Sequence, residues 1–301
     1  MKVEIRNRWT AAVQFSAEIP DDTEERFRIR AAVEIACSTR AVLTGAVLTD
    51  AVLTDAVLTD ADLTRADLTR ADLTGAVLTD ADLTGADLTG AALTDAVLTG
   101  ADLTGAVLTG AVLTRADLTD ADLTRADLTG ADLTGADLTR ADLTGAVLTR
   151  ADLTDAVLTR ADLTGADLTG AVLTRADLTG AVLTDAVLTD ADLTPIRDDF
   201  WAVLSAAPKE VDGLRKALAE GRVNGSTYTG ECACLVGTIA NVRGVRHDEL
   251  GILEPNSSRP AEVFFMAIRK GDTPGSNPFC KRALDWADEW VTNMRDAFGG
   301  K

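Results

Sequence analysis

The sequence is dominated by one five-residue phrase, Ala-(Asp/Val)-Leu-Thr-(Gly/Asp/Arg), which repeats 31 times without interruption from residue 41 to residue 195. A fixed period outweighs residue-by-residue propensity, because each repeat must pack in the same way as its neighbours. The first position is always Ala and the third always Leu, whereas the second is almost always Asp or Val and the fifth almost always Gly, Asp or Arg. We therefore expect Ala and Leu to face a crowded interior and the variable positions to face water.

An α-helix cannot satisfy this period. At about 100° per residue, apolar residues five apart drift round a helix instead of forming one stripe. The alternation of inward Ala, outward Asp or Val and inward Leu has the strand period of two, and the Thr-Gly, Thr-Asp and Thr-Arg steps suit corners. The repeat predicts a coil of short strands and corners that stacks identical residues in ladders.

The A-D-L-x-x phrase resembles the pentapeptide-repeat family, and the match covers residues 41–195. The resemblance implies a β-solenoid, namely a right-handed quadrilateral β-helix with four repeats per coil and with Leu and the preceding Ala pointing inward. The array would then make about eight coils and a rod of roughly 37 Å, at about 4.8 Å per coil. The near-identity of the repeats also fits a purely structural or a designed solenoid.

The array carries nearly all of the net charge. It holds 26 Asp and 8 Arg, which gives −18 of the −19 charges of the whole chain. Such a surface repels nucleic acid and anionic membranes and attracts a basic partner, although an acidic exterior also serves solubility. Indexed at four repeats per coil, the four sides carry −5, −4, −5 and −4, so no side stands out by its total.

The same indexing places aspartates directly above one another on one side, and this acidic ladder is the candidate binding surface. Its members are Asp62, Asp82, Asp102, Asp122, Asp142 and Asp162, and the interior leucines beside them are Leu63, Leu83, Leu103, Leu123, Leu143 and Leu163. Stacked like charges are unfavourable, so the ladder requires compensation or a use.

The resemblance extends to function, because some pentapeptide-repeat proteins mimic the shape and charge of DNA and bind type II topoisomerases. It implies a protein partner with a basic surface, such as DNA gyrase or topoisomerase IV, and no direct contact with nucleic acid or membrane. The leading hypothesis is a non-enzymatic protein-binding or scaffold protein with a rigid acidic rod, without cofactor or metal.

The flanking segments are expected to cap the open sheet edges of the array. Residues 1–40 predict two strands, 3–6 and 13–19, and a helix from Glu24 to about Cys37. Residues 196–301 predict a mainly helical domain with helices over 196–206, from Pro208 to Gly221, over 231–241 and from Pro278, while 262–269 suits a buried strand or helix. This domain could also support a homodimer.

An enzymatic alternative rests on Cys232 and Cys234, which the sequence places at the predicted start of a helix. A helix N-terminus lowers the pKa of a thiol, and His247 could act as its base. With Cys280, the same residues could form a zinc site, but their spacing matches no ordinary zinc pattern. Small buried cysteines are the plainer interpretation.

Sequence features also bear on location. Charged residues interrupt the first eight positions, and no stretch approaches the ~20 apolar residues that span a membrane. Four scattered cysteines are too few for a secreted disulfide framework. These features predict a soluble, cytoplasmic protein.

Overall fold

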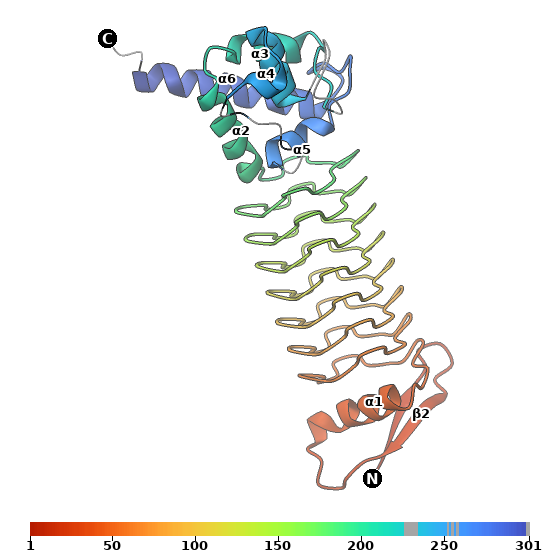
Figure 1. Cartoon of the computed structure of the whole chain (residues 1–301). Helices are drawn as coiled ribbons and strands as arrows, with labels where there is room; N and C mark the ends of the chain where they lie inside the picture. The colour runs from red at the N-terminus through yellow and green to blue at the C-terminus, as the bar shows by residue number, and fades with distance from the viewer. Residues whose placement is uncertain (226–233, 252, 254–255, 257–258, 299–301) are drawn as a thin grey trace. The chain divides into compact units, whose positions relative to one another are not determined.

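The computed structural model describes residues 1–225, 234–251, 253, 256 and 259–298. It divides into two compact units, residues 1–177 with 185–192 and residues 178–184 with 193–301. The helices and strands of the described residues are labelled in Figure 1 where there is room: β1 (Lys2–Arg6), β2 (Val13–Glu18), η1 (Glu25–Phe27), α1 (Arg28–Ser38), α2 (Thr194–Ala206), α3 (Val211–Ala219), α4 (Leu235–Arg243), η2 (His247–Glu249), α5 (Pro260–Met266) and α6 (Pro278–Phe298).

The array folds as a β-solenoid in which twenty residues make one coil (Figure 1). Parallel β-bridges join second-position residues twenty apart, from Val47 with Asp67 to Val172 with Asp192. Between bridged coils, the Leu123 N–H donates to the Asp142 carbonyl at 2.7 Å and the Asp142 N–H to the Ala121 carbonyl at 3.0 Å. Four pentapeptides per coil are confirmed, although each side pairs through a one-residue bridge instead of a longer strand.

The interior consists of the two invariant apolar positions. The six leucines beside the acidic ladder, Leu63, Leu83, Leu103, Leu123, Leu143 and Leu163, are each 0 to 1 % exposed. The first-position alanines between them are buried as well. Because Ala and Leu alternate around the inside of every coil, the apolar residues form a continuous core that passes from one coil to the next.

Each corner needs a left-handed backbone at the fifth position. From Gly45 to Asp190 the fifth residue has a φ of 53 to 69°, whether it is Gly, Asp or Arg. The turn is closed by the next Ala, as where the Ala46 N–H donates to the Leu43 carbonyl at 2.9 Å. Glycine adopts this conformation freely, and Asp does so more readily than a bulky residue. The frequent Gly and Asp at this position therefore have a conformational cause.

The N-terminal segment covers one edge of the first coil. β1 and β2 pair as an antiparallel hairpin, and α1 packs against both strands. The Val47 N–H donates to the Arg6 carbonyl at 2.8 Å, and the Arg8 N–H donates to the Gly45 carbonyl at 2.7 Å. The hairpin thus supplies partners that the missing preceding coil would have supplied. The helix expected from Glu24 starts at Arg28, after the short 3-10 helix η1.

The second unit has a core of its own. Aromatic side chains from α2, α5 and α6 pack together, with Phe264 5.1 Å and Phe200 6.2 Å from Trp286, measured between ring centroids. Pro195 lies in the first turn of α2, where its lack of an N–H costs nothing. The sequence left strand and helix open for residues 262–269, and most of these residues lie in helix α5. The helix expected over 231–241 begins at Leu235 among the described residues.

Candidate functional site

The acidic ladder is aligned as the period requires. Bridges join Asp62 to Asp82, and each following member to the next, up to Asp142 with Asp162. At the strand spacing of about 4.8 Å, six carboxylates therefore stand in one row of roughly 24 Å. The stacking of these six residues that the sequence predicts is the stacking observed. The ladder runs along one side of the solenoid.

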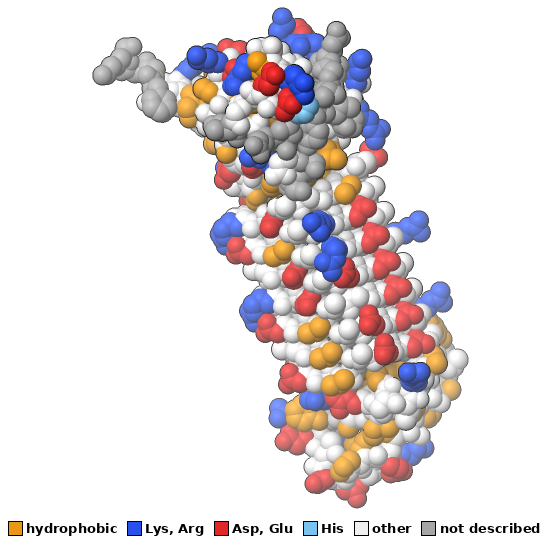
Figure 2. Space-filling model, in the orientation of Figure 1, with side chains coloured by type: hydrophobic (Ala, Val, Ile, Leu, Met, Phe, Trp, Pro, Cys, Tyr) orange, Lys and Arg blue, Asp and Glu red, His pale blue; other side chains and the backbone are white. Residues whose placement is uncertain are grey.

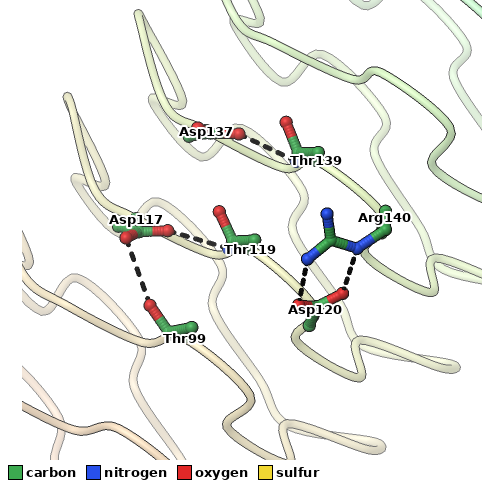
Figure 3. Close-up of polar contacts among 7 residues, drawn as sticks. All are labelled: Thr99, Asp117, Thr119, Asp120, Asp137, Thr139 and Arg140. Atoms are coloured by element: carbon green, nitrogen blue, oxygen red, sulfur yellow. Dashed lines mark hydrogen bonds and ion pairs between the residues drawn. The ribbon is translucent and has the colours of Figure 1, made fainter.

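Threonine provides the compensation that the stacked carboxylates require. In all six ladder residues a carboxylate oxygen accepts the backbone N–H of the Thr two positions later, at 2.8 to 3.1 Å. The same bond recurs on other sides: Figure 3 shows the Thr119 N–H donating to Asp117 at 3.0 Å, while the Thr99 hydroxyl of the preceding coil donates to the other oxygen at 3.1 Å. The carboxylates are thereby fixed in orientation.

Such donors also favour the charged state of Asp82 and Asp127. The Thr129 hydroxyl lowers the pKa of Asp127; burial opposes this shift, and the Thr129 N–H and the Thr109 hydroxyl reinforce it. For Asp82, burial raises the pKa most strongly, but the donors from Thr84 and Thr64 together outweigh it and the pKa falls below its usual value. Fixed hydrogen bonds to the ionised form thus favour the charged state of these two carboxyls.

A second set of charges lies at the corners. Arg140 forms a bidentate ion pair with Asp120, one coil earlier, with Nε 2.6 Å from Oδ1 (Figure 3). Three more pairs of the same kind join Asp50 to Arg70, Asp95 to Arg115 and Asp155 to Arg175. Each pair is exposed, so its main effect is to neutralise charge locally.

Charge varies along the solenoid in a way that totals per side conceal. The corner preceding the acidic ladder carries Asp60, Asp80, Gly100 and Asp120, and then Arg140 and Arg160. At this corner the ladder is therefore bordered by acids in its first coils and by bases in its later ones, whereas the corner after it carries Arg65 and Arg125 among glycines. Indexing the sequence by twenty would have shown this gradient, whereas adding the charges of each side removed it.

The thiol interpretation is wrong for Cys234. Its Sγ lies at the start of α4, where it accepts the Gly237 N–H at 3.5 Å, but the residue is 1 % exposed. Burial, followed by the neighbouring Glu262 carboxyl, raises the pKa of Cys234 far above its usual value. Desolvation of the thiolate outweighs the helix N-terminus, so this thiol is not activated.

The other residues of the cysteine hypothesis, where the structure describes them, are buried or half-buried. Cys232 lies outside the described residues. His247 begins the short 3-10 helix η2 and is half-buried. Cys280 is buried on α6 and its Sγ donates to the Leu218 carbonyl at 3.3 Å, and burial raises its pKa to about 11. Among the residues that the structure describes, no three His, Cys, Asp or Glu side chains gather as metal ligands would.

Glu262 is a buried acid that the sequence did not single out. It is 1 % exposed, and its Oε1 accepts the Val236 N–H at the start of α4 at 3.1 Å. Among the residues that the structure describes, its Oε2 has no hydrogen-bond partner. Burial raises the pKa of Glu262 above its usual value, despite the donors that surround the carboxyl. No sequence pattern distinguished this residue from surface glutamates.

Within the described part of the chain, every helix is too short or too polar to cross a lipid bilayer.

Known proteins similar to this chain share its repeat. HetL, a pentapeptide repeat protein involved in heterocyst differentiation regulation from Nostoc sp. strain PCC 7120, is 39% identical over 50% of this chain and 76% of its own, with a TM-score of 0.24. A pentapeptide repeat protein from the Arabidopsis thaliana thylakoid lumen is 38% identical over 35% of this chain and 74% of its own, with a TM-score of 0.19.

QnrB1, a plasmid-mediated fluoroquinolone resistance protein, is 19% identical over 49% of this chain and 84% of its own, with a TM-score of 0.30. No curated protein matches the chain significantly.

The family of pentapeptide repeats matches the array in eight copies, over residues 39–75, 61–100, 91–130, 136–175 and 161–194. These segments span half of the chain, and they coincide with the bridged coils of inward Ala and Leu. The chain therefore belongs to the pentapeptide-repeat family, and its array is the right-handed quadrilateral β-helix characteristic of that family.

Proposed function

We propose that this protein is a non-enzymatic scaffold that binds a basic protein through its acidic solenoid. The observation that carries the proposal is the ladder from Asp62 to Asp162, in which every carboxylate is oriented by a threonine N–H. Oriented charges lose little side-chain entropy on binding, so they suit recognition better than mobile ones. In this proposal residues 1–40 cap the array, residues 41–195 present the surface, and residues 196–301 form a separate helical domain.

The sharper form of the proposal is that the solenoid mimics DNA and binds a type II topoisomerase, either DNA gyrase or topoisomerase IV. The regular row of carboxylates, about 4.8 Å apart, has the sign and regularity that a phosphate-binding surface recognises. The net charge of −18 on the array supports a salt-sensitive encounter with such a surface. The burial of the Cys234 thiol, which raises its pKa, speaks against the form of the enzymatic alternative that uses Cys234.

The test is direct binding of the full-length protein to purified gyrase and topoisomerase IV at low and high salt. A variant with all six ladder aspartates changed to Asn is compared with a control in which six second-position aspartates of other sides are changed: Asp67, Asp72, Asp87, Asp127, Asp132 and Asp167. Both sets remove six charges and keep an oxygen for the threonine N–H.

Salt-sensitive binding that the ladder variant loses and the control retains is the expected result. Equal loss in both variants would show that total charge, not the ladder, attracts the enzyme. If wild-type protein binds neither enzyme at low salt, the topoisomerase target is wrong.

A further inference from the structure

One column of the solenoid surface begins with three valines. Bridges stack Val57, Val77 and Val97 on one another and then place Asp117 and Asp137 above them. Val57 is 58% exposed, and the other two valines are half-exposed. On this face, Figure 2 shows a column of three hydrophobic side chains continued by acidic ones. The valines form an apolar strip of about 10 Å along the axis; we call it the valine strip.

Acids border the valine strip on both sides. Asp55 and Asp95 lie at the corner before it, and Asp60 and Asp80 at the corner after it. The four Asp–Arg pairs found between successive coils of the described residues use Asp50, Asp95, Asp120 and Asp155. Asp55, Asp60 and Asp80 therefore keep charges that no arginine of the described residues pairs with.

The strip ends where its surroundings change. In later coils the column holds three aspartates and one valine, and Arg140 and Arg160 occupy the corner that Asp60 and Asp80 occupied. Two corner acids also lean over glycines of the next coil, with an Asp55 oxygen only 2.5 Å from where a Cβ on Gly75 would lie. Because Gly75 has no side chain, the Asp55 carboxylate has room to lie beside the valine strip. Among the described residues, only the first coils combine a column of three partly exposed valines with acids that no described arginine pairs with.

The backbone limits how a partner can dock on this face. The Val77 N–H already donates to the Ala56 carbonyl at 2.9 Å, and the Val97 carbonyl accepts the Leu78 N–H at 2.7 Å. A partner cannot add a strand to groups that are already paired, so it must engage the side chains. An extended chain repeats its same-face side chains about every 6.6 Å, whereas a helix returns every 5.4 Å, closer to the 4.8 Å coil spacing.

We infer that the valine strip is the docking site for a basic amphipathic helix of the partner protein. Two turns of such a helix would place apolar residues on Val57, Val77 and Val97. Lysine or arginine side chains on both flanks of its apolar stripe would meet Asp55, Asp60 and Asp80. Charge complementarity thus selects the occupant. The inference rests on the proposed function, because it names the part of the acidic surface that a basic partner uses.

The experiment uses full-length protein and three fluorescent peptides of about 18 residues, five helical turns. The first has Leu at helical spacing with Lys on both flanks. The second contains the same residues in an order that has no apolar face, and the third has Ser in place of Leu. Binding is measured by anisotropy at low salt, and helix formation by circular dichroism.

Two matched pairs of variants locate the site. The triple variant Val57→Ala, Val77→Ala and Val97→Ala is compared with a control at exposed valines of other sides, Val112→Ala, Val147→Ala and Val172→Ala. Ala92 already occupies the second position, so the fold accepts alanine there. The pair Asp60→Asn and Asp80→Asn is compared with Asp185→Asn and Asp190→Asn, which remove the same charge elsewhere.

We expect the amphipathic peptide to bind most tightly and to become helical on binding. The valine-strip variant should weaken it at least about tenfold, the Asp60 and Asp80 variant should weaken it too, and both controls should bind as wild type does. If all three basic peptides bind equally and no variant has a specific effect, the acidic scaffold stands and the valine-strip inference is overturned. If none of the basic peptides binds at low salt, both proposals are wrong.

Discussion

Arg115 forms a bidentate ion pair with Asp95, its Nε and Nη2 lying 2.8 and 2.7 Å from the two carboxylate oxygens. In all four such pairs the Asp stands twenty residues before the Arg, and no Arg of the array is followed twenty residues later by an Asp. This order agrees with the direction of the short fifth side chains, which lean toward the following coil. The Cγ of Arg65, for example, is 3.4 Å from where a Cβ on Gly85 would lie.

Exchanging the two residues, as Asp95→Arg with Arg115→Asp, should therefore fail to restore the pair. We expect a small fall in melting temperature at low salt, because the short carboxylate placed at position 115 would lean toward the coil after it, away from the guanidinium placed at position 95. Melting curves at low and high salt provide the measurement, since salt screens exposed pairs. A swapped protein with the wild-type melting temperature and salt response would contradict this directional rule.

The core and the surface of one repeat should respond in opposite ways to a change of side chain. Leu123→Asp places a charge at a site that is 1 % exposed and should cost several kcal/mol or stop the array from folding. Asp122→Asn keeps an oxygen for the Thr124 N–H, now 2.8 Å away, and removes a like charge from the ladder. We expect unchanged or slightly higher stability, measured by chemical denaturation. A marked loss from Asp122→Asn would show that the carboxylate charge itself holds the turn.

The solenoid should lose stability in acid. Donors from threonine lower the pKa of Asp127 and Asp167 in the folded state. Their contribution to the free energy of unfolding is therefore complete above the unfolded pKa, ordinarily near 3.9, and is lost as the pH falls through the lower folded value. Denaturation followed from pH 6 down to about pH 2 should show this decline. A variant with both residues changed to Asn should have a flatter profile, and an equally steep one would contradict the assignment.

Glu262 should have the reverse effect in the second unit. Burial raises its pKa, so the protonated form is the one that the fold favours. Its contribution is present below the unfolded pKa of the carboxyl and is lost as the pH rises through the raised folded value. Glu262→Gln should therefore stabilise this unit at neutral pH, and the two proteins should converge in acid. Melting followed by tryptophan fluorescence across pH 4 to 8 tests this, because three of the four tryptophans belong to that unit. A constant difference at every pH would contradict the prediction.

The described cysteines should react slowly with alkylating reagents in the folded protein. Burial raises the pKa of Cys37 and of Cys280 to about 11, and that of Cys234 further. Few thiolates are then present at neutral pH, and the thiolate is the reactive form. Iodoacetamide labelling at pH 8, mapped by mass spectrometry before and after unfolding, gives the rate at each position. Rapid labelling of native Cys234 would revive the thiol-enzyme hypothesis.

What the sequence predicts well here follows from its period. The inward Ala and Leu, the coil of four repeats and the alignment of Asp62 with Asp82 all follow once residues twenty apart are stacked. The missed features are contacts between repeats. The Thr99 hydroxyl reaches Asp117 eighteen residues later, and this bond depends on the rotamers of two coils. The burial of Cys234 against Glu262 depends on how α4 and α5 pack, which no local pattern encodes.

The coil of four repeats ties the identity of every surface to repeat number. Inserting or deleting a single pentapeptide would carry each downstream residue a quarter-turn round the axis, so a row of acids would be broken and continued on a neighbouring side. Gain or loss of four repeats at once would lengthen or shorten the solenoid and leave every column continuous. Growth by blocks of twenty residues would thus preserve a recognition surface, while growth by single repeats would generate new ones from the same phrase.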